Sequence, residues 1–274
     1  MGVMERIGPA DEYVGGRMLA GLMGNVGVMV FNHPERYNAI TAEMWGGVAD
    51  IMDRFSSDAS IRVVVLAGAG EKAFVSGGDI SQFAANRGNA EADATFTRST
   101  ARGRQALAKF EKPTIACLQG YCLGGGMAIA LETDLRIAAT GARLGIPAVR
   151  LGIAYGIASL EKLVDLVGPS RARMVMYSGR QFTAAEALAM GLVDQVVDEP
   201  RLLDTVLELA QTIAGNAPLA VMAAKFSMDQ LQKDTAERDM ERVAAYTRIC
   251  MDSADYLEGR TAFLEKRKPV FKGN

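Results

Sequence analysis

The sequence contains little of several residue types on which common catalytic sites depend. Its 274 residues include one histidine, His33, so a site with several histidine ligands is excluded and a Ser-His-Asp triad would have to use that residue. The three cysteines, Cys117, Cys122 and Cys250, are odd in number and lack the spacing of a metal site. We therefore predict reduced thiols, with Cys117 and Cys122 as small residues of the core.

The chain also lacks an excess of charge of either sign and a long apolar run. Its 30 Lys and Arg residues nearly balance 32 Asp and Glu residues, a net charge of −2 that disfavours general binding to nucleic acid. The most apolar stretch, residues 115–131, is shorter than the roughly 20 residues of a membrane-spanning helix and contains four glycines. Charged side chains interrupt the first twenty residues, unlike a secretory signal. We predict a cytoplasmic protein that binds neither membrane nor nucleic acid.

What the sequence does contain is the pattern of a globular α/β protein. Apolar residues make up 49% of the chain and charged residues 23%, enough for a full core. Strands are expected at residues 17–22, 26–31, 61–67, 114–118 and 135–139, and Thr41 is expected to cap a helix that runs through Phe55. A hairpin turn is expected at residues 23–25, a polar, mobile segment over residues 82–94, and a helix after the triple glycine that runs towards Asp134. Helical spacing then predicts helices over 201–215, 218–232 and 237–251. The change near Pro200 predicts an α/β core over residues 1–200 and a helical C-terminal subdomain over residues 201–274.

Two glycine clusters, each directly after a predicted buried strand, are candidate functional turns. They are AFVSGGDI at residues 73–80 and GYCLGGG at residues 120–126. Glycine lets a backbone approach a ligand closely, and a helix N-terminus offers unpaired N–H groups. Two such groups facing one carbonyl oxygen would form an oxyanion hole, in which each donor contributes about 3 kcal/mol to catalysis. Two tight structural turns explain the same glycines equally well, so this pattern alone leaves both interpretations open.

The order of these segments closely resembles the crotonase (enoyl-CoA hydratase/isomerase) superfamily from about residue 17 to residue 271. The resemblance implies an α/β fold, a spiral of ββα units followed by a helical C-terminal region that mediates trimers, often paired into hexamers. It also implies an acyl-CoA substrate, with coenzyme A as part of the substrate and no metal or redox cofactor. The matching segments are NHPERYNA at 32–39, residues 60–80, GYCLGGG at 120–126, LGIAYG at 151–156, TAAEALAMGLV at 183–193 and EGRTAFLEKRK at 258–268.

The resemblance also implies roles for individual residues. The backbone N–H groups of Gly78 and Gly125 would hold the thioester carbonyl, and Ser76 falls where the family contacts the adenine ring. Phe263 and Lys266 match positions that reach coenzyme A, often from a neighbouring subunit. The basic tail after Phe263 is either a solvated helix end or, as we expect, a patch that attracts the CoA phosphates. The residues expected to contact coenzyme A are Arg36, Ser76, Asp79, Ile80, Phe263 and Lys266.

The sequence departs from the family at two positions that matter for chemistry. Hydratases of the superfamily use two glutamates to position water and transfer its proton, and this chain has Ala128 and Ala148 there. Without both carboxylates, addition of water by that route should be slower by several orders of magnitude. We therefore expect an enzyme that stabilises a thioester enolate and performs decarboxylation, hydrolysis or carbon–carbon cleavage. The alternative is a CoA-thioester binding protein without catalysis.

Four other side chains are candidates for a role at this site. The position of Tyr155 resembles that of a tyrosine in the methylmalonyl-CoA decarboxylase branch of the superfamily. Tyr155 is therefore either a catalytic residue or a tyrosine that packs in its loop. Glu132 follows Ala128 by four residues, on the same helix face about 6 Å deeper, and is either a relocated acid/base or the partner of a nearby arginine. Asp79 contributes either to the chemistry or to the structure of its loop. For His33 we expect a surface role or a contact near coenzyme A.

Overall fold

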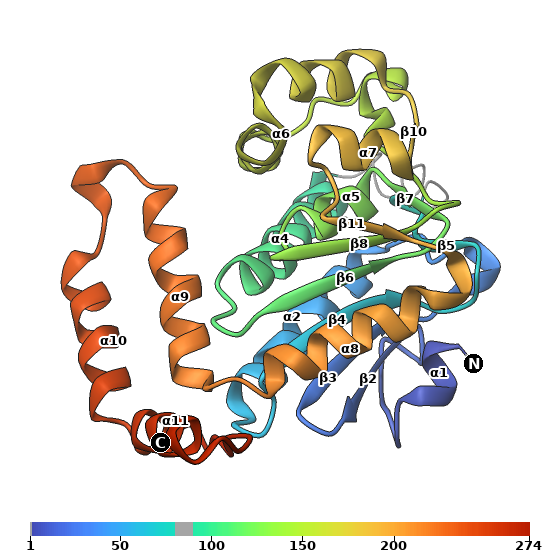
Figure 1. Ribbon diagram of the computed structural model, residues 1–274. Helices are drawn as coiled ribbons and strands as arrows, with labels where there is room; N and C mark the ends of the chain where they lie inside the picture. The colour runs from blue at the N-terminus through green and yellow to red at the C-terminus, as the bar shows by residue number, and fades with distance from the viewer. Residues whose placement is uncertain (1, 80–89) are drawn as a thin grey trace.

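The computed structural model describes residues 2–79 and 90–274, which form two β-sheets and their covering helices (Figure 1). The larger sheet has the strand order β1-β2-β3-β4-β6-β8-β11, and the smaller has the order β10-β9-β7-β5. The larger sheet contains β1 (Asp11–Tyr13), β2 (Met18–Met23), β3 (Val26–Phe31), β4 (Val63–Gly68), β6 (Thr114–Leu118), β8 (Leu135–Ala139) and β11 (Gln195–Val197). The smaller contains β5 (Ala73–Val75), β7 (Tyr121–Leu123), β9 (Arg143–Gly145) and β10 (Phe182–Thr183).

One unit of two strands and a helix is repeated along the core. In each unit the first strand joins the larger sheet, the second joins the smaller sheet, and a helix follows. The neighbours β3, β4, β6 and β8 pair in parallel, as do β5, β7 and β9. This repetition confirms the predicted α/β spiral of ββα units. The helices of the successive units are α4 (Ala90–Ala108), α5 (Gly125–Ala130) and α6 (Ile157–Ser178).

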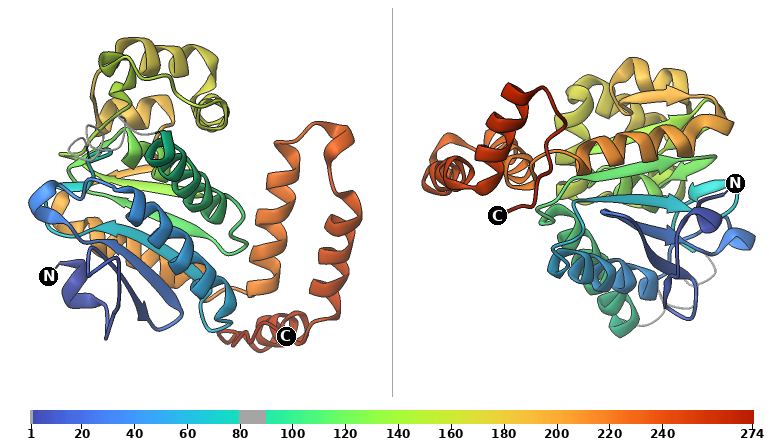
Figure 2. Two further views of the ribbon diagram at one scale, coloured as in Figure 1. Left: turned by 180° about the vertical axis from the view of Figure 1, so that it is seen from behind. Right: turned by 60° about the horizontal axis from the view of Figure 1, so that its bottom comes forward.

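The helices cover both faces of the larger sheet. Helix α2 (Ala42–Ser57) begins as predicted, with Thr41 Oγ1 accepting the Met44 N–H at 3.2 Å. Helices α2 and α4 lie side by side on one face, and α8 (Leu202–Ala214) crosses the other (Figures 1 and 2). Side chains of α8, such as Val206 and Ala210, are buried with Val63 and other residues of the sheet. The two apolar clusters on the two faces together make up the core.

After α8 the chain projects from the core as a helical arm (Figure 1). The arm consists of α9 (Pro218–Leu231), α10 (Met240–Asp252) and α11 (Ala254–Glu265). A domain boundary at residue 200 stays a prediction, but α8 lies after that residue and packs on the sheet, so the projecting part begins at Pro218. Among the described residues no single helix has the length and hydrophobicity to cross a membrane, and only Glu199–Ala214 and Pro218–Leu231, bent by 104°, meet those criteria as a pair.

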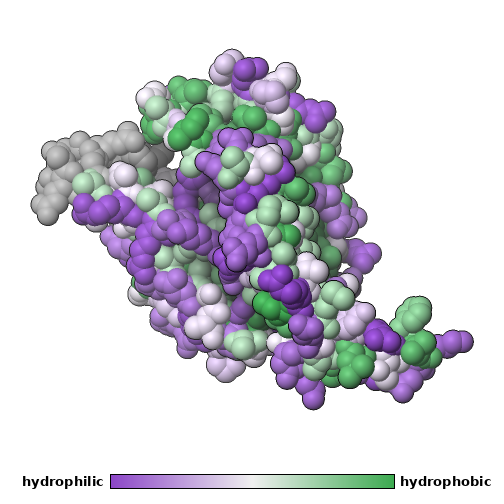
Figure 3. Space-filling model, turned by 90° about the vertical axis from the view of Figure 1, so that its left-hand side faces the viewer, coloured by the Kyte–Doolittle hydropathy of each residue, from purple (hydrophilic) through white to green (hydrophobic). Residues whose placement is uncertain are grey.

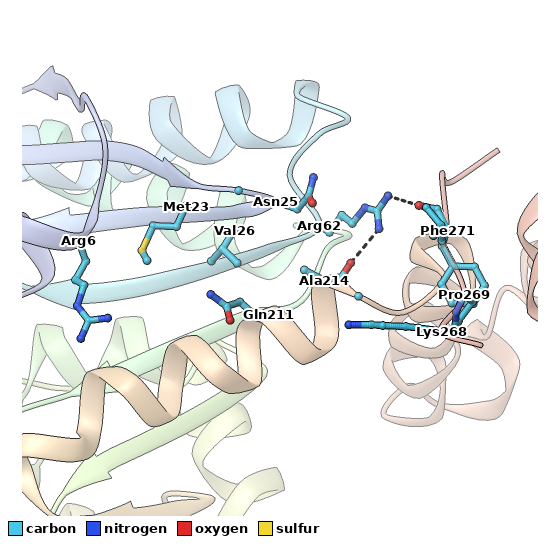
Figure 4. Close-up of a pocket in the computed structure, with 13 residues that line it drawn as sticks. Arg6, Met23, Asn25, Val26, Arg62, Gln211, Ala214, Lys268, Pro269 and Phe271 are labelled. Carbon is cyan, nitrogen blue, oxygen red and sulfur yellow. Dashed lines mark hydrogen bonds between the residues drawn. The ribbon is translucent and has the colours of Figure 1, made fainter. Parts of the chain in front are cut away.

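An open groove of about 810 Å³ lies at the root of the arm (Figure 4). It is lined by the turn between β2 and β3, the end of α8 and the C-terminal tail. Within it, Arg62 donates from Nη1 to the Ala214 carbonyl at 3.0 Å and from Nη2 to the Phe271 carbonyl at 2.6 Å. Ala214 precedes the arm and Phe271 follows it, so one guanidinium fixes both ends of the arm to the core.

Several sequence-based boundaries were wrong for local reasons. We expected the helix after the triple glycine to run towards Asp134, but α5 ends at Ala130 because Glu132 N–H bonds to Ile129 in a tighter turn. Helix α6 was not predicted, since Gly168 has non-helical angles inside it and interrupts the periodicity. We expected a polar, mobile segment over residues 82–94, but α4 begins at Ala90, and residues 80–89 lie outside the described part. The other short helices are α1 (Val3–Arg6), α7 (Ala184–Met190), η1 (Pro34–Arg36), η2 (Pro147–Leu151), η3 (Glu199–Arg201) and η4 (Thr235–Glu237).

The prediction of core thiols is confirmed. Cys117 and Cys122 are buried, and all three cysteines are free of disulfides. Burial raises the pKa of the Cys117 thiol to about 12 and raises that of Cys122 as well. Both thiols therefore stay protonated at neutral pH, as expected for small packing residues.

Asn38 joins the segments that carry the first glycine cluster. Its side chain is fully buried and donates from Nδ2 to the carbonyls of Ala69 and Ala73, at 3.0 and 2.7 Å. Its Oδ1 accepts the His33 N–H at 2.9 Å. The residue has a φ of +54°, a conformation that asparagine tolerates better than most residues. Asn38 thus fixes the β4–β5 loop against the turn that precedes Ile40.

Asn38→Ala should lower the free energy of unfolding by about 2–4 kcal/mol, because it leaves buried backbone groups without their partners. The matched control is Asn25→Ala, since Asn25 is exposed and donates one hydrogen bond, to the Ser60 carbonyl at 2.7 Å. We expect the control to lose less than about 1 kcal/mol in urea unfolding. Equal midpoints for the two variants would contradict this role of Asn38.

Candidate functional site

Gly78 lies in a parallel bridge that leaves its own N–H free to face another segment. Ile40 N–H donates to the Gly77 carbonyl at 2.8 Å, and Asp79 N–H donates to the Ile40 carbonyl at 3.0 Å. The bridge therefore uses the groups on either side of Gly78 and turns the Gly78 N–H away from Ile40. Among the backbone hydrogen bonds of residues 2–79 and 90–274, none has the Gly78 N–H as its donor.

The triple-glycine turn comes within contact distance of Gly78. A Cβ on Gly125 would lie 3.4 Å from the Gly78 nitrogen and 3.0 Å from Ile40 Cγ2. A Cβ on Gly126 would lie 2.1 Å from the Val75 carbonyl oxygen, which only glycine permits. Gly125 is the first residue of α5, and the first intrahelical bond runs from Ala128 N–H to the Gly124 carbonyl, so the helix does not use the Gly125 N–H. The structure thus brings together the two backbone donors predicted from the sequence.

Tyr155 is tied to the same turn. Its side chain is half-buried against the core, and its hydroxyl donates to the Gly124 carbonyl at 3.1 Å. Burial raises the pKa of the phenol well above its usual value; Arg104 lowers it in part, and Cys122 and Glu132 raise it further. The hydroxyl is therefore neutral at physiological pH and acts as a hydrogen-bond donor one residue from Gly125.

Ala128 and Ala148, the two positions where we expected a carboxylate to be missing, have apolar surroundings. Ala128 and Ala148 are 7% and 8% exposed and belong to the same apolar cluster of the core. Tyr155 packs against this cluster and is the polar group that reaches the glycine turn from it. A substrate carbon beside Ala128 or Ala148 would meet no carboxylate from those positions.

Glu132 is the partner of an arginine, which confirms the second of the two interpretations open for it. Arg104 on α4 donates to Glu132 Oε1 from Nε at 3.0 Å, and also from Nη2. The Glu132 side chain is 4% exposed, so this is a buried ion pair between α4 and the end of α5. Arg104 itself was missed in the sequence, because nothing in its local pattern distinguishes it from the neighbouring Arg102.

Three of the six residues expected to contact coenzyme A, Arg36, Ser76 and Asp79, lie near the glycine turns. Ser76 N–H donates to the Tyr37 carbonyl at 3.1 Å, which places Ser76 beside the turn that carries exposed Arg36. Asp79 follows Gly78 and is half-buried. Ile80, the remaining residue of this cluster, lies outside the described residues.

Phe263 and Lys266 are not near the glycine turns of the same chain. Both belong to the end of α11, which lies beside the C-terminus and far from β5 and β7 (Figure 1). Phe263 is 83% exposed. The side of the molecule that carries the arm shows hydrophobic residues among hydrophilic ones (Figure 3). The exposed apolar side chains of α9 to α11 include Met228, Leu231, Met240, Ile249, Met251, Leu257 and Leu264.

His33 lies in the turn before Asn38 and has an acidic neighbour. Its Nε2 is 3.2 Å from Glu35 Oε1, and its backbone N–H is the group bound by Asn38. In the part of the chain that the structure describes, no three His, Cys, Asp or Glu side chains gather in a way that could hold a metal ion. Among the described residues, the glycine turns, Asp79, Tyr155 and the Arg104–Glu132 pair are chemical groups that lie around this site.

Three comparisons with known proteins all point to one family. Residues 22–274 match the enoyl-CoA hydratase/isomerase family. A short-chain-enoyl-CoA hydratase from Clostridium acetobutylicum is 34% identical over 245 residues, covering 89% of this chain and 93% of that protein. A carnitinyl-CoA dehydratase from Escherichia coli (strain K12) is 34% identical over 244 residues, covering 86% and 91%. The structure of an enoyl-CoA hydratase/carnithine racemase from Magnetospirillum magneticum matches with a TM-score of 0.89 at 33% identity, covering 94% of this chain and 96% of that one.

Tyr155→Phe should change how stability depends on alkaline pH. Because the pKa of Tyr155 is raised in the folded state, its contribution to stability is fully present below pH 10, the ordinary tyrosine value, and is lost as the pH rises further. The free energy of unfolding should therefore fall less steeply above pH 10 in Tyr155→Phe than in the unmodified protein. Tyr177→Phe is the control, since Tyr177 is 76% exposed. Parallel pH profiles for all three proteins would rule out a raised pKa at Tyr155.

Proposed function

The chain belongs to the enoyl-CoA hydratase/isomerase family, and from this membership we propose that Gly78 and Gly125 hold the thioester carbonyl of an acyl-CoA. The observation that carries the proposal is the approach of the two glycine backbones, whose N–H groups are used by neither the bridge nor the helix. Two donors directed at one oxygen stabilise the negative charge that this oxygen gains when the substrate becomes an enolate.

We propose decarboxylation of a malonyl-type thioester, an acyl-CoA with a carboxylate on its α-carbon, as the reaction. In this step the bond between the α-carbon and the carboxylate breaks, its electron pair forms the thioester enolate, and carbon dioxide leaves. A proton then adds to the α-carbon. The enolate thus forms without a base that removes a proton, which suits a site with alanine at positions 128 and 148. Hydration and hydrolysis both require a group that activates water, so the same two alanines count against them.

Tyr155 is the side chain that we assign to this chemistry. Its neutral hydroxyl lies beside the oxyanion turn, where it donates to Gly124. With substrate bound, the same donor would orient the substrate carboxylate or donate to the enolate. Burial keeps the phenol protonated, which supports a role as donor and not as base.

We further propose that coenzyme A enters as part of the substrate, with no separate cofactor, and that the chain forms a homotrimer or a dimer of trimers. Arg36, Ser76, Asp79 and Ile80 would contact coenzyme A within one subunit. Phe263 and Lys266 would do so from a neighbouring one, which fits their exposure and their distance from the site in their own chain.

The purified protein should release carbon dioxide from malonyl-CoA or methylmalonyl-CoA and show negligible hydration of crotonyl-CoA. Tyr155→Phe should lower kcat by about 100-fold, the lower range for loss of one hydrogen-bond donor to a developing oxyanion, while Tyr177→Phe should leave it unchanged. Product analysis by mass spectrometry measures the decarboxylation. Loss of the absorbance of the conjugated enoyl thioester measures the hydration of crotonyl-CoA. Hydration at the rate of ordinary hydratases would contradict the proposal.

A CoA-thioester binding protein without catalysis is the second candidate. It is favoured by the same observation, that neither Ala128 nor Ala148 offers a carboxylate. Binding of several acyl-CoA esters without a product from any of them would establish this alternative and exclude decarboxylation.

Lys266→Gln should raise KM for the CoA ester by about 5-fold with an unchanged kcat, because it removes one exposed charge worth about 1 kcal/mol from the binding of CoA phosphates. Lys233→Gln, in the connection between α9 and α10, is the control on the same arm. Steady-state kinetics of the two variants measure the difference. A normal KM in Lys266→Gln would remove this residue from the CoA site.

A further inference from the structure

In the Arg104–Glu132 pair, the Nη1 nitrogen of the arginine takes no part in the hydrogen bonds. Both contacts of the pair converge on Glu132 Oε1, from Nε and Nη2 of Arg104. Among residues 2–79 and 90–274 no acceptor pairs with Arg104 Nη1, and this nitrogen is not one of the buried atoms left without a partner. Nη1 therefore faces accessible space, and it can donate hydrogen bonds to a further group.

The exposed part of the pair is the donor and not the acceptor. The Arg104 side chain is 18% exposed, whereas that of Glu132 is 4% exposed. A molecule that approaches the pair therefore meets the guanidinium first. A guanidinium binds carboxylates with two parallel hydrogen bonds, and it can serve one carboxylate through Nε and another through its remaining nitrogens.

The pair lies close to the proposed acyl site. Glu132 lies in the turn that directly follows α5, four residues after Ala128 and two after the last helical residue, Ala130. Both members of the pair also act electrostatically on Tyr155, whose hydroxyl binds Gly124. One turn before Arg104 on the same helix, the buried Thr100 Oγ1 has no hydrogen-bond partner among the described residues.

We propose that Arg104 is the specificity-determining residue of the site and binds a carboxylate carried by the acyl group of the substrate. This inference rests on the proposed function and adds to it the residue that selects a carboxyacyl-CoA over an uncharged acyl-CoA. Around Ala128 and Ala148 the wall is apolar, so an unpaired substrate carboxylate would be costly to bury there. Glu132 already offsets much of the charge of Arg104, so the arginine orients the carboxylate without stabilising it so strongly that loss of carbon dioxide is prevented.

The test compares esters that differ in charge and match in shape. Malonyl-CoA has isovaleryl-CoA as its uncharged counterpart, and succinyl-CoA has 4-methylpentanoyl-CoA. The carboxylate of succinyl-CoA is not β to the thioester, so its binding can be measured without decarboxylation. Dissociation constants come from rapid displacement of a fluorescent CoA thioester bound to the full-length protein.

The variant removes both charges together, Arg104→Gln with Glu132→Gln, because a single change would leave a buried charge unpaired and destabilise the fold. Arg102→Gln is the matched control, since Arg102 lies on the same helix and pairs with Asp50 on the surface at 2.7 Å. We expect the unmodified protein and the control to prefer the carboxylate by about tenfold in at least one pair of esters, and the double variant to lose that preference.

Each outcome bears on a different claim. Equal affinities within both pairs, or a preference that survives in the double variant, overturn the role of Arg104 and leave the proposed function standing. Displacement by none of the four esters overturns the proposed function together with this inference. A preference for the carboxylate without release of carbon dioxide supports Arg104 and contradicts decarboxylation.

Discussion

The contact on which the site depends is the approach of two backbones, at Gly78 and Gly125. A Cβ at Gly125 would lie 3.4 Å from the Gly78 nitrogen and 3.0 Å from Ile40 Cγ2, so the two turns lie in contact with each other. Other contacts hold each turn in place. The bridge to Ile40 and the buried Asn38 side chain hold the turn at Gly78, and the contact of Gly126 with Val75 holds the turn at Gly125. The ββα repeat brings these turns together because β5 and β7 are adjacent in the smaller sheet.

The oxyanion hole that we propose would explain how a chain with one histidine can carry a reactive site. Backbone N–H groups stabilise an enolate oxygen without any ionisable side chain, and they need no reorganisation when the charge develops. The described side chains around them include the neutral Tyr155, which binds Gly124, and the Arg104–Glu132 pair. Their chemistry favours donation of hydrogen bonds and disfavours removal of protons. The family fold is thus combined with alanine at positions 128 and 148.

The sequence predicted those parts of the structure that depend on local pattern. The β2–β3 hairpin, the Thr41 cap and the two glycine turns are each encoded within a few neighbouring residues, and the resemblance supplied their order in space. Three features could not be predicted because they depend on partners distant in the chain. Asn38 binds residues more than thirty positions away, Arg62 joins Ala214 to Phe271, and Arg104 meets Glu132 only after α4 packs beside α5. Helix α6 was missed because Gly168 breaks its period.

The central claim is that the Gly78 and Gly125 N–H groups polarise the thioester carbonyl of a bound acyl-CoA. Infrared difference spectroscopy with a ¹³C label at that carbonyl measures the polarisation directly, without any turnover. Two hydrogen bonds from the glycine turns should move the carbonyl stretch of bound acetyl-CoA to a clearly lower frequency than in water. A frequency equal to or higher than that of the free thioester in water would contradict the account.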